Sequence, residues 1–182
     1  MTEPTLITAN SEEEIALNLT AYLQRQSEAF QHMVALQQNG RRILLEVDID
    51  PGGGFESGYA TTRLSAPVAE GGDFAFTIHP EGFLADFAKL FGLQDEVVGY
   101  PEFDEKVIIK TNHKEKVRAV FADETTRQIL SMLSNFTLQL RIEDDGRRLL
   151  QLELEEGITD PASIMNLYKT FLNVLEQVEK IG

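Results

Sequence analysis

The chain has 182 residues, 42% hydrophobic and 25% charged, a composition typical of a folded globular protein rather than a disordered or fibrous one. It contains no cysteine, which excludes disulfides, thiolate metal ligands and thiol nucleophiles and favours a reducing compartment. Thirty acidic against sixteen basic side chains give a formal charge of −14, which disfavours nucleic acid and anionic lipid as partners. Such a charge favours solubility, or else a basic partner or a cation.

The N-terminal region bears on localisation and on the first helix. The sequence opens without a basic region or a signal-like apolar run, and no later stretch reaches the roughly 20 apolar residues of a membrane helix. We therefore expect a cytoplasmic protein. The capping-box pattern Ser11-Glu-Glu-Glu14 then predicts a first helix from about 12 to 28.

Asn39-Gly40 predicts a two-residue type I′ hairpin, because both residues tolerate positive φ. The alternative is a longer first helix, since the apolar spacing continues to Leu36. The hairpin gives one nearly all-apolar face, which favours it. Its expected cross-strand pairs are Leu36 with Ile43, Val34 with Leu45, His32 with Val47, and Phe30 with Ile49.

The middle of the chain alternates between strand and helix patterns. Strands are expected at 58–68, 73–79, 106–111 and 117–122. An amphipathic helix is expected where apolar residues recur at helical spacing before Gly92, namely Phe83, Leu84, Phe87, Leu90 and Phe91. A further helix is expected after the cap Asp123, with Ile129, Leu130 and Leu133 buried.

A second hairpin and a final helix complete the expected fold. A three-residue loop at Asp144-Asp145-Gly146 keeps the faces consistent and pairs Leu140 with Leu150, Leu138 with Leu152, and Phe136 with Leu154. The last helix is expected to begin at Asp160-Pro161, a cap followed by proline. The segments 39–44 and 145–150 are similar and follow a phenylalanine at the same offset, so two related halves, about 1–95 and 96–182, are an alternative to one undivided domain over 1–182.

Two groups of residues next to the first hairpin suggest a ligand site, but each has a simpler interpretation. Glu46, Asp48 and Asp50 project from one face of a strand, where consecutive carboxylates do not converge as a calcium ion requires, so a solvated strand face is favoured. Gly52-Gly53-Gly54 lacks the phosphate-loop signature and the following helix, which favours a bulged connection between strands.

The remaining candidates are isolated. His32, His79 and His113 show no metal-ligand spacing, Ser57 lacks a nucleophile-elbow pattern, and Asp104 is flanked by Gly and Pro as a turn residue would be. No catalytic, metal-binding or cofactor-binding residue and no cofactor is therefore assigned.

The segment Gly99-Tyr-Pro-Glu-Phe-Asp104 leading into 105–112, followed by 122–130 and a closing hairpin and helix, resembles a pattern in uncharacterised bacterial proteins. The resemblance covers the C-terminal half, its distinctive motif is the Gly-x-Pro-x-Phe-Asp strand entry, and it implies no activity. In outline, a small acidic protein with helices beside an antiparallel sheet is also similar to secretion chaperones that bind an effector segment and dimerise.

These patterns together predict an α+β fold of about eight antiparallel strands, arranged as hairpins, and about four helices, with the first and last helices packed on the sheet. The absence of a recognisable catalytic motif favours a non-enzymatic protein-binding or adaptor module, acting on a protein partner or as a homodimer, with strand addition at a sheet edge as one contact route. The alternative is a small-molecule sensor or enzyme with an apolar, phenylalanine-rich cavity.

Overall fold

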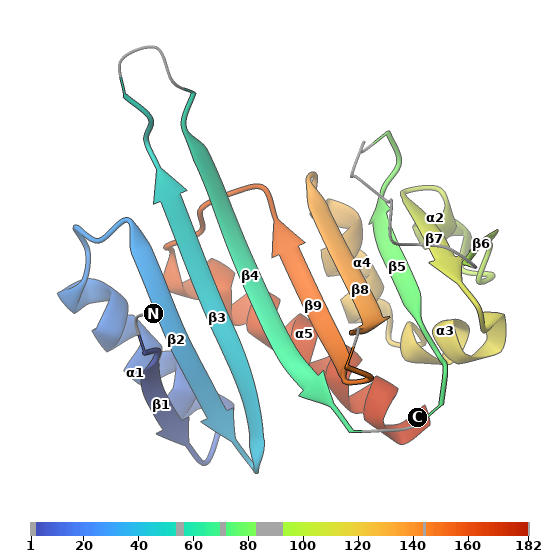
Figure 1. Ribbon diagram of the computed structural model, residues 1–182, viewed down its shortest axis with the longest axis horizontal. Coiled ribbons are helices and arrows are strands. Elements are labelled where there is room, and N and C mark those ends of the chain that lie inside the picture. Colours follow the sequence, from blue (N-terminus) through green and yellow to red (C-terminus); the bar gives the residue numbers. More distant parts are fainter. Residues whose placement is uncertain (1–2, 54–56, 70–71, 83–92, 144, 182) are drawn as a thin grey trace. The chain divides into compact units, whose positions relative to one another are not determined.

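The α+β class is confirmed by a computed structural model, which describes residues 3–53, 57–69, 72–82, 93–143 and 145–181 (Figure 1). These residues form nine mostly antiparallel strands and five helices. The strands are β1 (Thr5–Ala9), β2 (Gln31–Gln38), β3 (Arg41–Asp50), β4 (Tyr59–Val68), β5 (Phe76–Pro80), β6 (Gln94–Glu96), β7 (Val107–Thr111), β8 (Phe136–Ile142) and β9 (Arg148–Leu154). The helices are α1 (Glu12–Arg25), α2 (Pro101–Asp104), α3 (Lys114–Val120), α4 (Glu124–Met132) and α5 (Pro161–Ile181).

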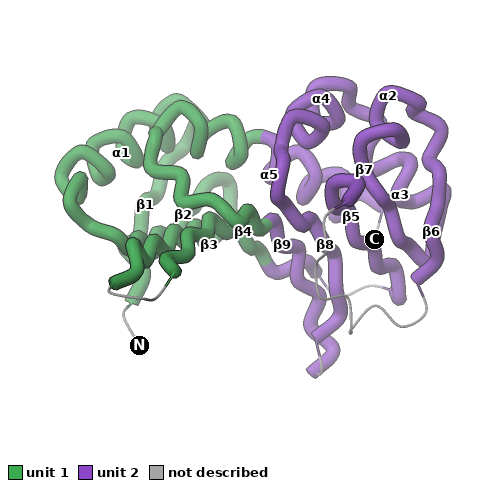
Figure 2. Tube along the Cα trace, turned by 90° about the horizontal axis from the view of Figure 1, so that it is seen from above, with its two compact units in different colours: residues 1–66, 153–169 green, residues 67–152, 170–182 purple. Residues whose placement is uncertain are grey.

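The chain divides into two compact units, coloured in Figure 2. Unit 1 comprises residues 1–66 and 153–169, and unit 2 comprises residues 67–152 and 170–182. Each unit is therefore discontinuous in sequence, with boundaries different from those of the two halves suggested by the internal similarity. The single domain and the related halves both stay predictions.

Unit 1 contains the first hairpin in the predicted register. Leu36 pairs with Ile43, Val34 with Leu45 and His32 with Val47, and the Ile49 amide donates to the Phe30 carbonyl at 2.8 Å. Asn39 and Gly40 have φ of 50° and 79°, as a type I′ turn requires. The hairpin interpretation is thus confirmed over the longer helix, and β4 and β1 flank it in the strand order β1-β2-β3-β4.

Helix α1 follows the predicted capping chemistry and packs on the sheet of unit 1. The Ser11 hydroxyl accepts from the Glu14 amide at 3.2 Å, and Glu14 Oε2 accepts from the Asn10 amide at 2.8 Å. The helix ends at Arg25, slightly earlier than expected. Its buried side chains Ile15, Leu19 and Leu23 recur every four residues and form the stripe that packs on the strands.

Helix α5 begins where Asp160-Pro161 predicts, with Asp160 Oδ2 accepting from the Ser163 amide at 2.8 Å. Its residues in unit 1 include the buried Ile164 and Tyr168, and the Tyr168 hydroxyl donates to Gln38 Oε1 of β2 at 2.9 Å. Burial raises the pKa of this phenol to about 12, so it stays a hydrogen-bond donor at neutral pH. Both the first and the last helix therefore pack on strands, as predicted.

Unit 2 is built around aromatic side chains. Its strands follow the order β9-β8-β5-β7-β6, and β5 pairs antiparallel with both β7 and β8. Phe121 lies with its ring centroid 5.6 Å from those of Phe76 and of Phe103, and all three rings are fully buried. Such aromatic pairs stabilise a core beyond the area they bury.

One predicted strand is wrong. Residues 117–122 were expected to be extended, but Lys114–Val120 is helix α3. Val117, Val120 and Phe121 are fully buried at i, i+3 and i+4, the spacing of one helical face, and that packing outweighs the β-branched composition of the segment.

Other expectations are met in part. Asp123 caps α4 as predicted, but of the three side chains expected to be buried there only Leu130 is fully so. Strands β1 and β6 and helix α2 were not anticipated. The helix expected at 83–91 lies outside the described residues and stays a prediction. In the second hairpin the Glu143 amide donates to the Arg147 carbonyl at 2.7 Å and Gly146 has φ of 83°, as the predicted three-residue loop requires, whereas Asp144 lies outside the described residues.

Candidate functional site

The three carboxylates on β3 are engaged with separate partners. Glu46 Oε2 lies 3.6 Å from Arg63 Nη1, and Asp48 accepts from Gln31 Nε2 at 2.9 Å. Asp50 Oδ1 accepts from the Gly52 amide at 2.9 Å. Within the described ranges no three His, Cys, Asp or Glu residues are placed to hold a metal ion. The structure thus places these carboxylates along a strand face rather than around a point.

The described part of the glycine-rich segment follows the end of β3. Gly52 has φ of 72°, and its amide points at a carboxylate rather than outward as in a phosphate loop. Gly53 and Ser57 are described, whereas Gly54 is not. Gly52 and Gly53 thus lie in the connection between β3 and β4, as expected, while a bulge there stays a prediction.

The three histidines have different contacts. His79 Nδ1 is 3.0 Å from the Pro80 carbonyl oxygen, and His113 Nε2 is 3.1 Å from Asp73 Oδ1 on the surface of unit 2. His32 belongs to unit 1, where it is buried against the edge of the Tyr22 ring, with centroids 5.8 Å apart. Each imidazole thus has a different local environment.

Burial of His32 predicts an acid-sensitive fold. Desolvation lowers the pKa of its imidazole below the ordinary 6.5, and a hydrogen bond to the Ala29 backbone opposes this only in part. As pH falls from 6.5 towards the folded-state pKa, the unfolded chain takes up a proton that the folded chain does not, so stability is lost. We expect the urea midpoint to fall between pH 7.5 and pH 5 by less in His32→Phe than in wild type. Equal losses would show that His32 does not contribute.

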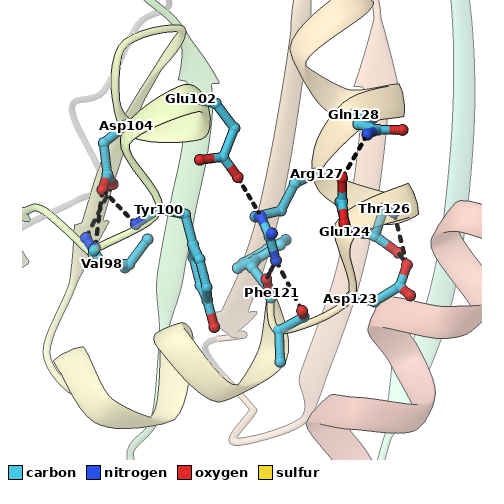
Figure 3. A network of polar contacts seen from close by, with 12 residues as sticks. Val98, Tyr100, Glu102, Asp104, Phe121, Asp123, Glu124, Thr126, Arg127 and Gln128 are labelled. Atoms are coloured by element: carbon cyan, nitrogen blue, oxygen red, sulfur yellow. Dashed lines mark hydrogen bonds and ion pairs between the residues drawn. The ribbon is translucent and has the colours of Figure 1, made fainter.

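Asp104 organises a loop, as its turn interpretation predicts. Its carboxylate accepts from the amides of Val98, Gly99 and Tyr100 at 2.9–3.0 Å (Figure 3). Gly99 has φ of 89°, a conformation that glycine adopts without strain. The Gly-x-Pro-x-Phe-Asp segment therefore comprises a loop closed by the Asp104 carboxylate and helix α2, and it leads into β7.

The Asp104 loop presents Tyr100 to an arginine that sequence reasoning missed. The Arg127 guanidinium carbon lies 3.9 Å from the centroid of the Tyr100 ring, and Nε donates to Glu102 Oε1 at 3.2 Å. Nη1 donates to the carbonyls of Phe121 and Ala122, both at 2.8 Å, at the C-terminal end of α3. This Tyr100–Arg127 cluster joins α2, α3 and α4, which indicates a structural role (Figure 3).

An open groove of about 340 Å³ lies between β1 and α1 in unit 1. We call it the edge groove; its walls are Thr5–Thr8 of β1 and Asn18, Tyr22, Arg25 and Gln26 of α1. These α1 residues are spaced i, i+4, i+7 and i+8 and so lie on one stripe of the helix.

Strand β1 gives the edge groove its chemistry. It pairs in parallel with β2 and is the first strand in the order, so among the described residues no strand pairs with its other side. Such an edge offers backbone N–H and C=O groups to a further strand. Leu6, the second residue of β1, is 57% exposed and adds an apolar contact beside that backbone.

Comparison with known proteins does not identify a family or a function for this chain. No protein-family model matches the sequence, and no curated protein matches it. The structure is similar to the crystal structure of the mycobacterial trehalose monomycolate transport factor A, TtfA, with a TM-score of 0.49 and 9% sequence identity over 93% of this chain and 91% of that chain. Identity this low assigns the chain neither to a family nor to an activity. Within the described part of the chain, no helix has the length and apolar character needed to cross a membrane.

Proposed function

We propose that this protein is a non-enzymatic protein-binding module whose edge groove accepts an extended peptide segment of a partner as an additional strand beside β1. The observation that supports this most directly is that an edge strand and one stripe of a helix line the same open groove. In strand addition the sheet edge supplies backbone hydrogen bonds, and side-chain pockets beside it supply specificity.

The alternating geometry of a strand defines what the partner presents. Successive peptide side chains would point alternately towards the groove and away from it, and only every second peptide N–H would face β1. Binding by strand addition therefore requires every second amide of the peptide backbone. Binding through apolar side chains alone would not show this alternation.

The test uses seven-residue peptides selected from a random phage-displayed library on the immobilised full chain, then synthesised with a fluorophore. We expect Leu6→Asp to weaken binding at least about tenfold, because it places a charge beside the added strand. Leu17→Asp is the matched control, since Leu17 is 70% exposed on α1 and does not line the groove.

N-methylation of the same peptide tests the backbone. Methyl groups on one alternate set of amides should abolish binding, whereas methyl groups on the other set should be tolerated. Failure to select any peptide, or equal sensitivity to both methylation sets, contradicts strand addition. A selected peptide that binds both aspartate variants equally contradicts the edge groove as the site.

A homodimer would use the same edge if two copies paired through β1. Light scattering after gel filtration distinguishes this case, because a β1-mediated dimer would dissociate in Leu6→Asp but not in Leu17→Asp.

A further inference from the structure

A second surface of unit 1 lies where β2 begins, β3 ends and β4 begins. It is an open cleft of about 470 Å³, which we call the aromatic–acidic cleft; its lining includes Phe30, Asp48, Ile49, Asp50, Pro51 and Tyr59. None of the described residues that line it is basic. The edge groove shares none of its lining residues with this cleft.

The aromatic side chains of the cleft are unusually exposed. Phe30 is 57% and Tyr59 52% exposed, and they are the two aromatic residues among the exposed large hydrophobic side chains of the described chain. Both line this one cleft. Exposed aromatic rings that gather in a concave surface are typical of binding sites rather than of ordinary protein surface.

The carboxylates of the cleft are held in place before any partner arrives. Asp48 accepts from Gln31 Nε2 at 2.9 Å and from the Tyr59 hydroxyl at 3.0 Å. The hydrogen bond to Asp48 and the negative charges of Asp48 and Asp50 raise the pKa of the Tyr59 phenol, so the hydroxyl stays a donor. These contacts fix one carboxylate beside the ring of Tyr59.

The backbone brings Tyr59 and Asp50 together. The two residues are cross-strand partners in the β3–β4 pair. A Cβ on Gly58 would meet the Pro51 carbonyl carbon at 2.8 Å and its oxygen at 2.9 Å, so only glycine allows the start of β4 to pass this close to the end of β3. The second carboxylate is thus also held beside the exposed ring of Tyr59, with Oδ1 bonded to the Gly52 amide.

The protein itself shows what such a combination of groups binds. In unit 2 the ring of Tyr100 and the carboxylate of Glu102 hold the guanidinium of Arg127, with its carbon 3.9 Å from the ring centroid and Nε 3.2 Å from Oε1 (Figure 3). A planar guanidinium stacks on an aromatic face while donating to a carboxylate, which the more compact ammonium group does less well. The cleft in unit 1 presents the same groups outward.

We propose that the aromatic–acidic cleft docks an arginine side chain of a protein partner. The guanidinium stacks on the exposed ring of Tyr59 and donates to Asp50, while its methylene stem contacts Pro51. A cationic partner residue also suits a chain with a net charge of −14. This proposal does not depend on strand addition at β1.

The test is a titration of the ¹⁵N-labelled full chain with N-acetyl-arginine amide, followed by amide chemical shifts. We expect a millimolar dissociation constant, with the shifts concentrated at 29–31, 48–51 and 59. N-acetyl-citrulline amide is the matched probe, because it is nearly isosteric but uncharged, and it should cause much smaller shifts.

Two variants and one control assign the binding groups. Tyr59→Leu and Asp50→Asn should each weaken arginine binding at least about threefold, through loss of the ring and of the charge. Glu155→Gln removes an equal charge from an exposed position of unit 1 and should leave binding unchanged. Thermal unfolding of each variant shows that the fold is retained.

Three outcomes overturn the proposal. If the citrulline probe causes shifts equal to those of the arginine probe, the positive charge is not recognised. If N-acetyl-lysine amide causes equal shifts, the guanidinium group is not specifically recognised. Absent shifts, or shifts spread over the acidic surface and weakened as much by Glu155→Gln, would show that the cleft is not the site. Each result leaves the peptide test of the edge groove unaffected.

Discussion

Replacing Arg127 with methionine is expected to destabilise unit 2 by about 3 kcal/mol, because the carbonyls of Phe121 and Ala122 lose a shared charged donor in a buried setting. The methionine side chain can still cover the Tyr100 ring, so the loss reports mainly on hydrogen bonds. Hydrogen exchange of the amides in α3 and α4, read by mass spectrometry, should show a matching loss of protection.

Arg118→Met is the matched control for Arg127. Its guanidinium carbon lies 6.0 Å from the centroid of the same Tyr100 ring, and the residue is exposed, so we expect a change below about 0.5 kcal/mol. Arg127→Lys should recover only part of the loss, because an ammonium group cannot reproduce the planar set of donors. A methionine variant as stable as wild type would show that water satisfies the two carbonyls equally well.

The features predicted correctly from sequence depend on residues close together in the chain. The Ser11 and Asp123 caps bond to amides three residues away, and the Asn39-Gly40 turn fixes the register of the strands that flank it. In each case a short polar side chain or a positive φ leaves few alternatives, so the pattern is read directly from the sequence.

The features that were missed depend on distant residues. Strand β1 is only five residues long and is defined by parallel pairing with β2, some thirty positions later, so the edge groove has no local signal. Val117 to Phe121 fits either a strand or a helix until the rings of Phe76 and Phe103 determine which face is buried. Tertiary packing overrides local propensity at such positions.

The aromatic–acidic cleft depends both on residues close together in the chain and on residues distant in the chain. Its Asp48 and Asp50 were recognised as carboxylates on one strand face, and that interpretation is correct for their alternation along β3. What the sequence does not show is that β4 brings Tyr59 beside them, or that Phe30 remains exposed at the start of β2. The spatial combination, rather than any single residue, makes this surface a binding candidate.

Gly157 is the position in unit 1 where a small change is expected to have the largest effect. A Cβ there would lie 2.7 Å from Ile49 Cδ1 and 3.2 Å from Ala60 Cβ. The Thr62 hydroxyl holds the backbone on both sides, donating to the Glu156 carbonyl at 2.7 Å and accepting from the Ile158 amide at 2.8 Å. Because the segment cannot move away without breaking these bonds, we expect Gly157→Ala to destabilise unit 1 by about 2 kcal/mol.

The cause can be tested with a double-mutant cycle. Ile49→Ala removes the atoms that the new methyl group would meet, so the two substitutions together should cost at least about 1 kcal/mol less than the sum of the single changes. Gly53→Ala is the matched control, since a Cβ there has nothing within 4 Å, and it should be nearly neutral. Additive costs in urea unfolding would mean that the penalty comes from the backbone of Gly157 rather than from its contact with Ile49, and that Thr62 does not hold the segment against β3.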